Sequence, residues 1–244
     1  MKIAIIGYGK MGKEIESIAI ARGHEIVARF STQHALNADE LKKADVAIEF
    51  TKPDTAPENL THCLQNGVPV VCGTTGWYDH FETIATLCKT NNGSLFTATN
   101  FSLGVNITFA LNEWLAKIMA GQSGYRAGIT EIHHTRKLDA PSGTGLTLAQ
   151  GIIRNNPHFE GWKLESACAT ADSGQVPIHA IREGEVPGTH VVTWESEIDT
   201  LKLEHIAHSR KGFALGAVLA SEWLIEHKGV FGMQDMLNFD AVIR

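Results

Sequence analysis

The residues best suited to chemistry lie in one segment, residues 131–145, which reads Glu-Ile-His-His-Thr-Arg-Lys-Leu-Asp-Ala-Pro-Ser-Gly-Thr-Gly. The imidazoles of His133 and His134 precede the ammonium of Lys137 by a few residues. A histidine and a lysine beside a bound carboxylate are suitable proton donors near neutral pH. The Pro-Ser-Gly-Thr sequence at 141–144 is typical of a capped helix start, whose N–H groups can bind a carboxylate. The segment therefore predicts a site that binds an anion and protonates it; the alternative is a surface loop with incidental basic residues.

The two adjacent histidines do not favour a metal site. Neighbouring residues of an extended chain point to opposite sides, so only one of the two imidazoles readily faces a given ligand. The sequence contains no H-E-x-x-H or similar metal-ligand spacing. We therefore expect no metal in this site.

A glycine-rich loop at the N-terminus gives the second chemical signal. Residues 7–12 match G-x-G-x-x-G and stand between an apolar strand expected at 2–6 and a helix expected at 11–22. In dinucleotide-binding folds the first glycine permits a tight turn, the second lets the pyrophosphate approach the backbone, and the third lets the helix pack on the strand. A glycine-rich turn without a ligand is the alternative. The cofactor contacts expected here are Gly7, Tyr8, Gly9, Lys10, Met11 and Gly12.

The end of the second expected strand favours NADPH over NADH. An NAD site normally has an Asp or Glu at this position, but here the sequence is Ala-Arg-Phe-Ser-Thr with no acid. The guanidinium of Arg29, with the hydroxyls of Ser31 and Thr32, suits a 2′-phosphate, and Lys52 could add a second positive charge. We predict NADPH as the cofactor. NADH remains the alternative if Arg29 is only a solvated charge at a strand end.

Two further loops follow expected strands and belong on the nicotinamide side of the same site. In an open α/β sheet, ligands bind beyond the carboxyl ends of the strands. Residues 73–76 follow a strand expected at 68–72, and residues 98–102 follow one expected at 94–97. Backbone groups there would hold the carboxamide, and the Phe101 ring would pack on the nicotinamide; ordinary turns are the alternative. The expected contacts are Gly73, Thr74, Thr75, Ala98, Thr99, Asn100 and Phe101.

The first half of the chain alternates strand and helix patterns with short connections, which predicts βαβ units and a parallel sheet with covered faces. After Gly104 the pattern changes to a longer helix at 105–119, a strand at 126–134 and a helix at 144–154. Residues 176–208 are β-like with short turns, which suits an antiparallel or mixed sheet. Further strands are expected at 24–30 and 44–50, and further helices at 59–66, 80–90 and 211–228.

These patterns predict an α/β protein of two domains. A Rossmann-like, parallel-sheet nucleotide-binding domain would comprise residues 1–103 and 210–244, because the apolar helix near the C-terminus could return to it. Residues 104–209 would form a smaller α+β domain with a mixed sheet, for substrate binding and oligomerisation.

The composition is that of an ordinary globular protein and excludes some partners. The chain has 244 residues, 43% hydrophobic and 20% charged, with a net charge of −6. An acidic balance argues against nucleic acid or a membrane surface as the main partner. Any bound anion must therefore be held by local basic residues.

The cysteines and the N-terminus indicate a cytoplasmic protein. The four cysteines are widely separated and form no C-x-x-C pair, so we expect buried thiols in a reducing compartment. They are Cys63, Cys72, Cys88 and Cys168. The N-terminal residues lack the regions of a signal peptide, and no apolar stretch has the length needed to span a bilayer.

The segment 131–145 closely resembles the signature E-x-H-H-x-x-K-x-D-A-P-S-G-T-A of bacterial dihydrodipicolinate reductases (4-hydroxy-tetrahydrodipicolinate reductases). Two positions depart from the family pattern: Thr99 replaces a frequent proline, and Gly145 replaces a common alanine. The resemblance covers essentially the whole chain. Besides the glycine loop, its short matches lie at 49–51, 53, 73–75, 100–102, 104–106, 181–182, 184, 188, 190, 209–210, 213–214 and 216–217.

This resemblance implies the reduction step of the diaminopimelate route to lysine, in which a nicotinamide hydride reaches C4 of a small heterocycle with two carboxylates. It implies that His133 is the proton donor or acceptor and that Lys137 is a proton donor. It further implies cofactor contacts at the three loops and at Thr51, and a homotetramer assembled through the sheet of the second domain. Arg136 and Asp139 are left with structural roles. The implied substrate-binding residues are His134, Ser142, Gly143 and Thr144.

Two other functions are compatible with parts of the sequence. Another two-domain nicotinamide oxidoreductase, such as an aspartate or semialdehyde dehydrogenase, would need a catalytic cysteine or a different lysine arrangement, and the relevant loops contain no cysteine. A non-catalytic NADP-binding sensor would keep the glycine loop but has no need for His133, Lys137 and the Ser-Gly-Thr turn together.

Overall fold

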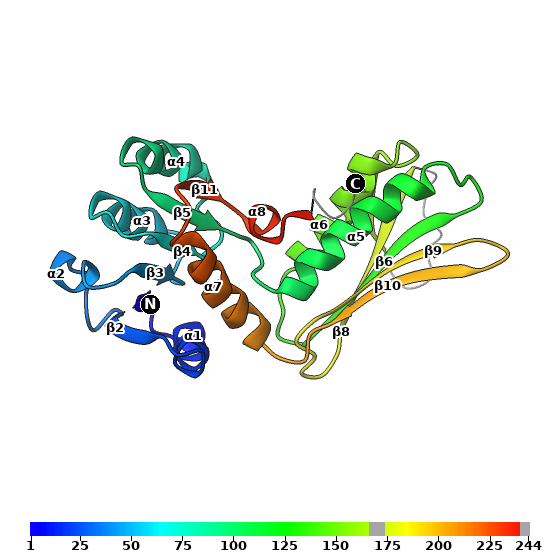
Figure 1. The fold of residues 1–244 in the computed structure, drawn as a ribbon. Helices are drawn as coiled ribbons and strands as arrows, with labels where there is room; N and C mark the ends of the chain where they lie inside the picture. The colour runs from blue at the N-terminus through cyan, green and yellow to red at the C-terminus, as the bar shows by residue number, and fades with distance from the viewer. Residues whose placement is uncertain (166–173, 240–244) are drawn as a thin grey trace. The chain divides into compact units, whose positions relative to one another are not determined.

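The structure is a computed structural model that describes residues 1–165 and 174–239 (Figure 1). The chain divides into two compact units. The first contains the described residues of Met1–Leu103 and Lys211–Arg244, and the second those of Gly104–Arg210. Cys168 lies outside the described residues.

The first unit is built on a six-stranded parallel sheet with the strand order β11-β5-β4-β3-β1-β2. Helices α1 and α7 contribute to the core on one face, and α3 and α4 to the core on the other. The strands are β1 (Lys2–Ile6), β2 (Glu25–Phe30), β3 (Val46–Glu49), β4 (Val70–Cys72), β5 (Ser94–Thr97) and β11 (Gly229–Phe231). The helices are α1 (Lys10–Ala21), α2 (Ala38–Leu41), α3 (Ala56–Gln65), a 3-10 turn η1 (Tyr78–His80), α4 (Phe81–Thr90), α7 (Lys211–Leu224) and α8 (Met233–Leu237).

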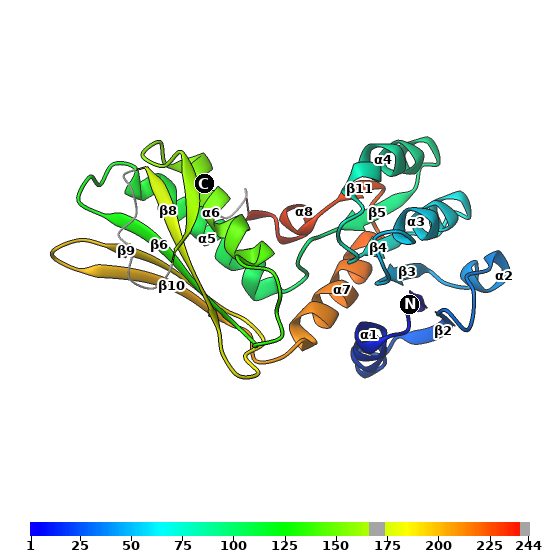
Figure 2. The same cartoon turned by 180° about the vertical axis from the view of Figure 1, so that it is seen from behind.

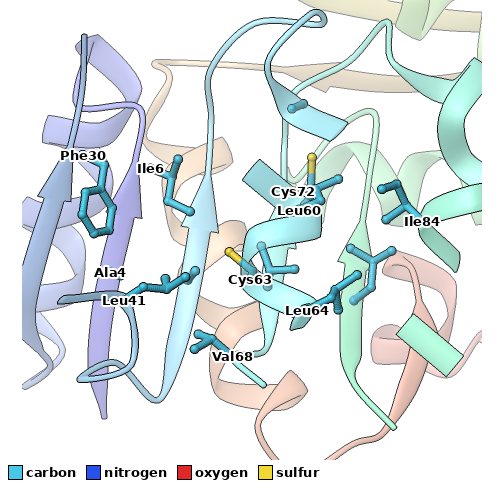
Figure 3. Packing of buried hydrophobic residues seen from close by; sticks show 14 of the residues in the cluster. Ala4, Ile6, Phe30, Leu41, Leu60, Cys63, Leu64, Val68, Cys72 and Ile84 are labelled. Atoms are coloured by element: carbon cyan, nitrogen blue, oxygen red, sulfur yellow. The ribbon is translucent and has the colours of Figure 1, made fainter. Parts of the chain in front are cut away.

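Strand β1 shows why both faces of this sheet are covered. Its apolar residues run without a polar interruption, and alternate side chains enter opposite cores. Ala4 and Ile6 join the cluster under α3 and α4, whereas Ile3 and Ile5 join the cluster under α1 and α7. Figure 3 shows the first of these clusters, with Ile6 on the sheet and residues of α3 among the labelled side chains.

The second unit has a five-stranded mixed sheet with the order β10-β9-β6-β8-β7. Strands β6, β8 and β7 are parallel, while β9 is antiparallel to both β6 and β10. Helices α5 and α6 pack on one face, as both ribbon views show (Figures 1 and 2). The elements are α5 (Leu103–Met119), β6 (Arg126–His133), α6 (Gly143–Asn155), β7 (Gly161–Glu165), β8 (Gln175–Arg182), β9 (Thr189–Glu195) and β10 (Thr200–Ile206).

The predicted fold class is confirmed, with corrections at short elements. Strand β8 continues to Arg182 rather than ending at 178, and α7 ends at Leu224 rather than 228. Strands β7 and β11 and helices α2 and α8 were not expected. β7 and β11 are edge strands of five and three residues, too short for a clear period of two. Within 1–165 and 174–239, no helix is both long and apolar enough to cross a membrane.

Candidate active site

The glycine loop after β1 forms a tight cradle at the start of α1. Gly7 has φ +98°, and an added Cβ would lie 2.0 Å from the carbonyl oxygen of Phe50. A Cβ on Gly12 would lie 2.4 Å from the carbonyl oxygen of Gly7, so the helix packs closely on the loop. At Gly9, in contrast, an added Cβ would meet nothing within 4 Å. The loop thus leaves open room before a helix N-terminus, which fits a pyrophosphate.

Two neighbouring cavities lie at the carboxyl ends of the parallel strands. One, of about 510 Å³, is bordered by the glycine loop, the end of β2 and residues 50–52. The other, of about 390 Å³, is bordered by the glycine loop, Thr51 and residues 73–75. Both are lined by Gly7, Gly9, Phe50 and Thr51, so they adjoin. The predicted cofactor residues that line them are Gly7, Tyr8, Gly9, Lys10, Met11, Thr51, Gly73, Thr74 and Thr75.

The last predicted cofactor loop does not line either cavity. Phe101 is 2% exposed, and its ring packs between Phe50 and Phe96 at centroid distances of 5.7 and 5.8 Å. A Cβ on Gly216 of α7 would lie only 1.7 Å from its carbonyl oxygen. The ring is thus part of the core of the first unit, and its contact with a nicotinamide stays a prediction. Ala98, Thr99 and Asn100 likewise line neither cavity.

Arg29 is paired within the protein. Its Nε donates to Glu16 Oε1 at 3.0 Å, and its Nη2 also contacts that oxygen. The Tyr8 hydroxyl donates to the other carboxylate oxygen, and the guanidinium lies 5.9 Å from the centre of the Tyr8 ring. The hydrogen bond from Arg29 lowers the pKa of Glu16. Helix α1 thus places a carboxylate against Arg29 at the end of β2, a contact that the strand-end pattern could not reveal.

A buried carboxylate supports the loops around these cavities. Glu49, the last residue of β3, has no exposed surface. It accepts hydrogen bonds from the Thr51 hydroxyl, from Asn59 Nδ2 at 3.3 Å and from Cys72 Sγ at 3.2 Å. The Thr51 N–H in turn donates to Thr74 Oγ1 at 2.7 Å. Glu49 therefore joins the ends of β3 and β4, a role that the sequence analysis did not assign.

The described cysteines are buried and unpaired, as predicted. Cys63, Cys72 and Cys88 form no disulfide. Burial raises the pKa of all three thiols, which makes them poor nucleophiles at neutral pH.

In the second unit, the pleat of β6 places Glu131 and His133 on the same face of the sheet. This face is the one that α5 and α6 cover, because Ile129, two residues earlier, belongs to their shared core. Glu131 is fully buried, and His133 ends the strand. His133 Nδ1 lies 3.0 Å from Glu131 Oε2. Strand geometry alone therefore pairs the predicted proton donor with a carboxylate.

Glu131 also binds two donors from outside its own strand. Its Oε1 lies 3.0 Å from Arg182 Nη2 on β8 and accepts the Ser142 N–H at 3.1 Å. Burial would raise the pKa of Glu131, but the hydrogen bonds from His133, Ser142 and Arg182 outweigh burial and lower it to about 2. The carboxylate is therefore ionised at neutral pH.

His190 completes the cluster from the neighbouring strand. It stands opposite Glu131 in the β6–β9 register, and its ring lies 5.0 Å from that of His133. Its Nε2 is 3.2 Å from Ser142 Oγ. Burial, followed by the charge of His133, lowers the pKa of His190 to about 4, so the ring is neutral at pH 7. No role for His190 was evident in the sequence.

The start of α6 is built as the sequence predicts. Ser142 is the N-cap, and its Oγ accepts the Gly145 N–H at 3.1 Å. A Cβ on Gly143 would meet nothing within 4 Å, so the backbone there is accessible. Gly143 and Thr144 are the first two helical residues, at the helix end that favours an anion. The structure thus joins the predicted carboxylate-binding turn to the Glu131–His133 pair.

Lys137 and its neighbours form ion pairs. Lys137 Nζ lies 2.8 Å from both carboxylate oxygens of Asp139, whose backbone carbonyl accepts from Arg182 Nη2 at 2.6 Å. Asp139 therefore contacts the predicted proton donor directly, beyond the purely structural role expected. Arg136 forms an exposed bidentate pair with Glu185. His134 lies just past the end of β6 and is half-buried, outside the contacts of the Glu131 cluster.

A Rossmann-type unit with a glycine cradle, joined in one chain to a mixed-sheet unit with an imidazole–carboxylate cluster, defines a two-unit nicotinamide-dependent oxidoreductase. Two family descriptions match the chain: dihydrodipicolinate reductase, N-terminus, over residues 1–101, and dihydrodipicolinate reductase, C-terminus, over residues 104–237. The chain belongs to the dihydrodipicolinate reductase family, which confirms the resemblance seen in the sequence.

Individual relatives agree with this assignment. The chain is 48% identical over 241 residues to the 4-hydroxy-tetrahydrodipicolinate reductase of Christiangramia forsetii, covering 98% of both chains. It is 36% identical over 203 residues to that of Chromobacterium violaceum, covering 81% of this chain and 75% of the relative. The dipicolinate-bound dihydrodipicolinate reductase of Paenisporosarcina sp. TG-14 has a similar structure. Its TM-score is 0.81 at 26% identity, covering 96% of this chain and 98% of that one.

Proposed function

We propose that this protein catalyses the nicotinamide-dependent reduction of 4-hydroxy-tetrahydrodipicolinate to tetrahydrodipicolinate, in the diaminopimelate route to lysine. The relatives named above are reductases of this substrate. The observation that carries the proposal is the junction of His133 with the start of α6. One buried carboxylate contacts His133 Nδ1 and the Ser142 N–H, so a proton donor and a carboxylate-binding helix start are held together.

The residues of the second unit would bind the substrate and supply its proton. The N-terminal groups of α6, at Ser142, Gly143 and Thr144, would hold one ring carboxylate, with His134 as a further contact. His133 would donate the proton, and Lys137 would assist it from the Asp139 pair. The bound nicotinamide supplies the hydride. Asp139 would fix the Lys137 ammonium until a substrate carboxylate competes for it.

Steady-state kinetics with freshly generated substrate test these roles. His133→Gln and Lys137→Ala should each lower kcat by about 10²–10⁴-fold, the usual contribution of a positioned proton donor. Arg136→Ala is the matched control, because it removes a cation from the same segment that is paired at the surface with Glu185. Full rates in both variants would contradict the assigned roles, and a wild-type protein without turnover would contradict the substrate.

We propose NADPH as the preferred cofactor, with NADH also accepted. The glycine cradle and the two adjoining cavities fit a dinucleotide. Ser31, Thr32 and Lys52 line the larger cavity and could face a 2′-phosphate. Arg29 could reach that phosphate only by sharing its guanidinium with Glu16. The ratio of kcat/KM for NADPH to that for NADH tests the preference.

We propose that the protein acts in the cytoplasm as a homotetramer assembled through the sheet of the second unit. The face of this sheet opposite α5 and α6 carries apolar side chains, among them Ile181 and Ile206, which are 41% and 51% exposed. They lie in one row across the sheet with Ile132 and Thr189. Light scattering that gives the mass of a single 26.6 kDa chain would contradict the tetramer.

A further inference from the structure

Glu131 faces the imidazole of His133 in a way that can set its protonation pattern. His133 Nδ1 and Glu131 Oε2 lie 3.0 Å apart, and both atoms are buried. The contact is an ion-pair contact: among the described residues, neither atom has a hydrogen-bond partner of regular geometry. An ionised carboxylate can only accept, so the hydrogen of a neutral His133 ring belongs on Nδ1. The lone pair, or the transferable proton of the charged ring, is then on Nε2.

A glycine packs against the opposite side of the His133 ring. A Cβ on Gly188 would lie 3.1 Å from His133 Nε2 and 3.4 Å from Cδ2. Gly188 also has φ +156°, a backbone angle that L side chains rarely adopt. Glycine at this position therefore avoids a Cβ that would crowd Nε2.

The Glu131 carboxylate is itself held in place. Its Oε1 is fixed by Arg182 Nη2 and by the Ser142 N–H, which come from β8 and from the cap of α6. Because a carboxylate is rigid and planar, fixing Oε1 also fixes the direction of Oε2. The same side chain therefore relates the His133 ring to the helix start that is proposed to bind a substrate carboxylate.

A metal ion is the competing interpretation of this cluster. The ligand atoms of Glu131, His133 and His190 lie within 4.8 Å of one another. However, Oε1 of Glu131 is already used by Arg182 and Ser142, and His190 Nε2 contacts Ser142 Oγ. A divalent ion here would also be repelled by the adjacent guanidinium. The contacts therefore favour a proton-positioning role.

We propose that Glu131 is a positioning residue that fixes the Nδ1–H tautomer and the ring orientation of His133 and ties this ring to the start of α6. The catalytic consequence rests on the proposed function, because it requires that His133 supplies the proton. The tautomer of His133 does not depend on the proposed function.

Glu131→Gln is a sharp test because it should reverse the tautomer. Ser142 N–H and Arg182 both need an acceptor, so the amide oxygen takes the place of Oε1. The amide NH₂ then faces His133 Nδ1 and can only donate to it, which moves the ring hydrogen to Nε2. Glu131→Asp keeps the charge and the acceptor on a shorter side chain, and should retain the Nδ1–H tautomer.

Long-range ¹H–¹⁵N NMR correlations of His133, at a pH where the ring is neutral, report the tautomer directly. We expect Nδ1–H in the wild type and in Glu131→Asp, and Nε2–H in Glu131→Gln. In parallel, kcat should fall about 100-fold or more in Glu131→Gln and should be partly restored in Glu131→Asp. Glu185→Gln, which removes an exposed carboxylate, is the control that should keep both the tautomer and the rate.

An Nε2–H tautomer in the wild type would overturn the proposal, even if Glu131→Gln did not fold. An unchanged tautomer and rate in Glu131→Gln would also overturn it. So would stoichiometric Zn²⁺ binding that is lost in both Glu131→Gln and His190→Gln. If the wild type shows the Nδ1–H tautomer but does not turn over 4-hydroxy-tetrahydrodipicolinate, the proposed function fails and the positioning of His133 stands.

Discussion

Glu49 and Glu131 are glutamates without exposed surface, one in each unit. A buried carboxylate needs hydrogen-bond donors, and the two residues obtain them from different kinds of group. Both lie at or near the carboxyl end of an inner strand of their sheet. Glu49 is satisfied by neutral donors: a hydroxyl, an amide and a thiol. Glu131 is satisfied by a guanidinium and a backbone N–H, and it faces an imidazole.

The difference separates a structural carboxylate from one that we propose to position a proton donor. Neutral donors around Glu49 can fix the loops beside the cofactor cavities but have no proton to exchange near neutral pH. At Glu131 the hydrogen bonds from His133, Ser142 and Arg182 outweigh burial and keep the carboxylate ionised, with a pKa of about 2. The buried charge of Glu131 is paired with Arg182 through one carboxylate oxygen, and the other oxygen faces His133.

The largest expected effect is a difference in stability between the isosteric variants Glu131→Gln and Glu49→Gln. Removing the Glu131 charge leaves Arg182 with an uncompensated charge in a site that is 20% exposed, and should lower the free energy of unfolding by about 3–5 kcal/mol. Glu49→Gln leaves no charged partner unpaired, because the donors around Glu49 are neutral, and should cost about 1–3 kcal/mol. Hydrogen exchange at β6 and β3 measures the loss in each unit separately. Equal losses at the two strands would contradict the expected difference between Glu131 and Glu49.

A second difference is acid sensitivity, which should come from His190 in the Glu131 cluster. Its folded pKa of about 4 is below the ordinary 6.5, so the unfolded chain takes up a proton that the folded chain refuses. The stability that His190 contributes is therefore complete above pH 6.5 and is lost as the pH falls to 4. The loss amounts to about 3 kcal/mol. The stability that Glu131 contributes is lost at a lower pH, between about pH 4.5 and pH 2.

Unfolding in urea at pH 7 and at pH 4.5 measures this loss. His190→Gln cannot titrate, so its free energy of unfolding should change less between the two pH values than that of the wild type. An identical change in both proteins would assign the acid sensitivity to other groups.

The sequence predicts those parts of the molecule whose signal is local. The alternation of apolar runs and helices is enough for the parallel sheet, and the contiguous segment 131–145 contains both His133 and the cap of α6. Edge strands such as β7 and β11 were missed because they are short and half-exposed.

The roles that escaped prediction depend on residues far apart in the chain. Glu131 is visible in the sequence, but its role depends on Arg182, 51 residues away, and on the register that places His190 opposite. Phe101 was assigned to the cofactor by its place after a strand, yet its ring fills the core beside Phe96. A strand-end position indicates where a residue lies but not which way its side chain points.

The smallest expected effect concerns a partly exposed ion pair, Glu16–Arg29, beside the cofactor cavity. Glu16→Gln removes the charge that competes for the guanidinium, so a 2′-phosphate should bind better. The ratio of kcat/KM for NADPH to that for NADH should rise up to about tenfold, equivalent to about 1.4 kcal/mol. Arg29→Ala should lower the same ratio by a similar factor. Because the Arg29 side chain is 41% exposed, both variants should change stability by less than about 1 kcal/mol.

Glu14→Gln is the matched control, since it removes one negative charge from the same helix without removing a partner of Arg29. A ratio that rises equally in Glu14→Gln and Glu16→Gln would indicate a general effect of charge on NADPH binding. A ratio unchanged in both Glu16→Gln and Arg29→Ala would show that the pair is only a surface ion pair. A rise confined to Glu16→Gln would mean that this partly buried carboxylate tunes ligand choice at little structural cost, whereas a change at fully buried Glu131 is expected to lower both stability and activity.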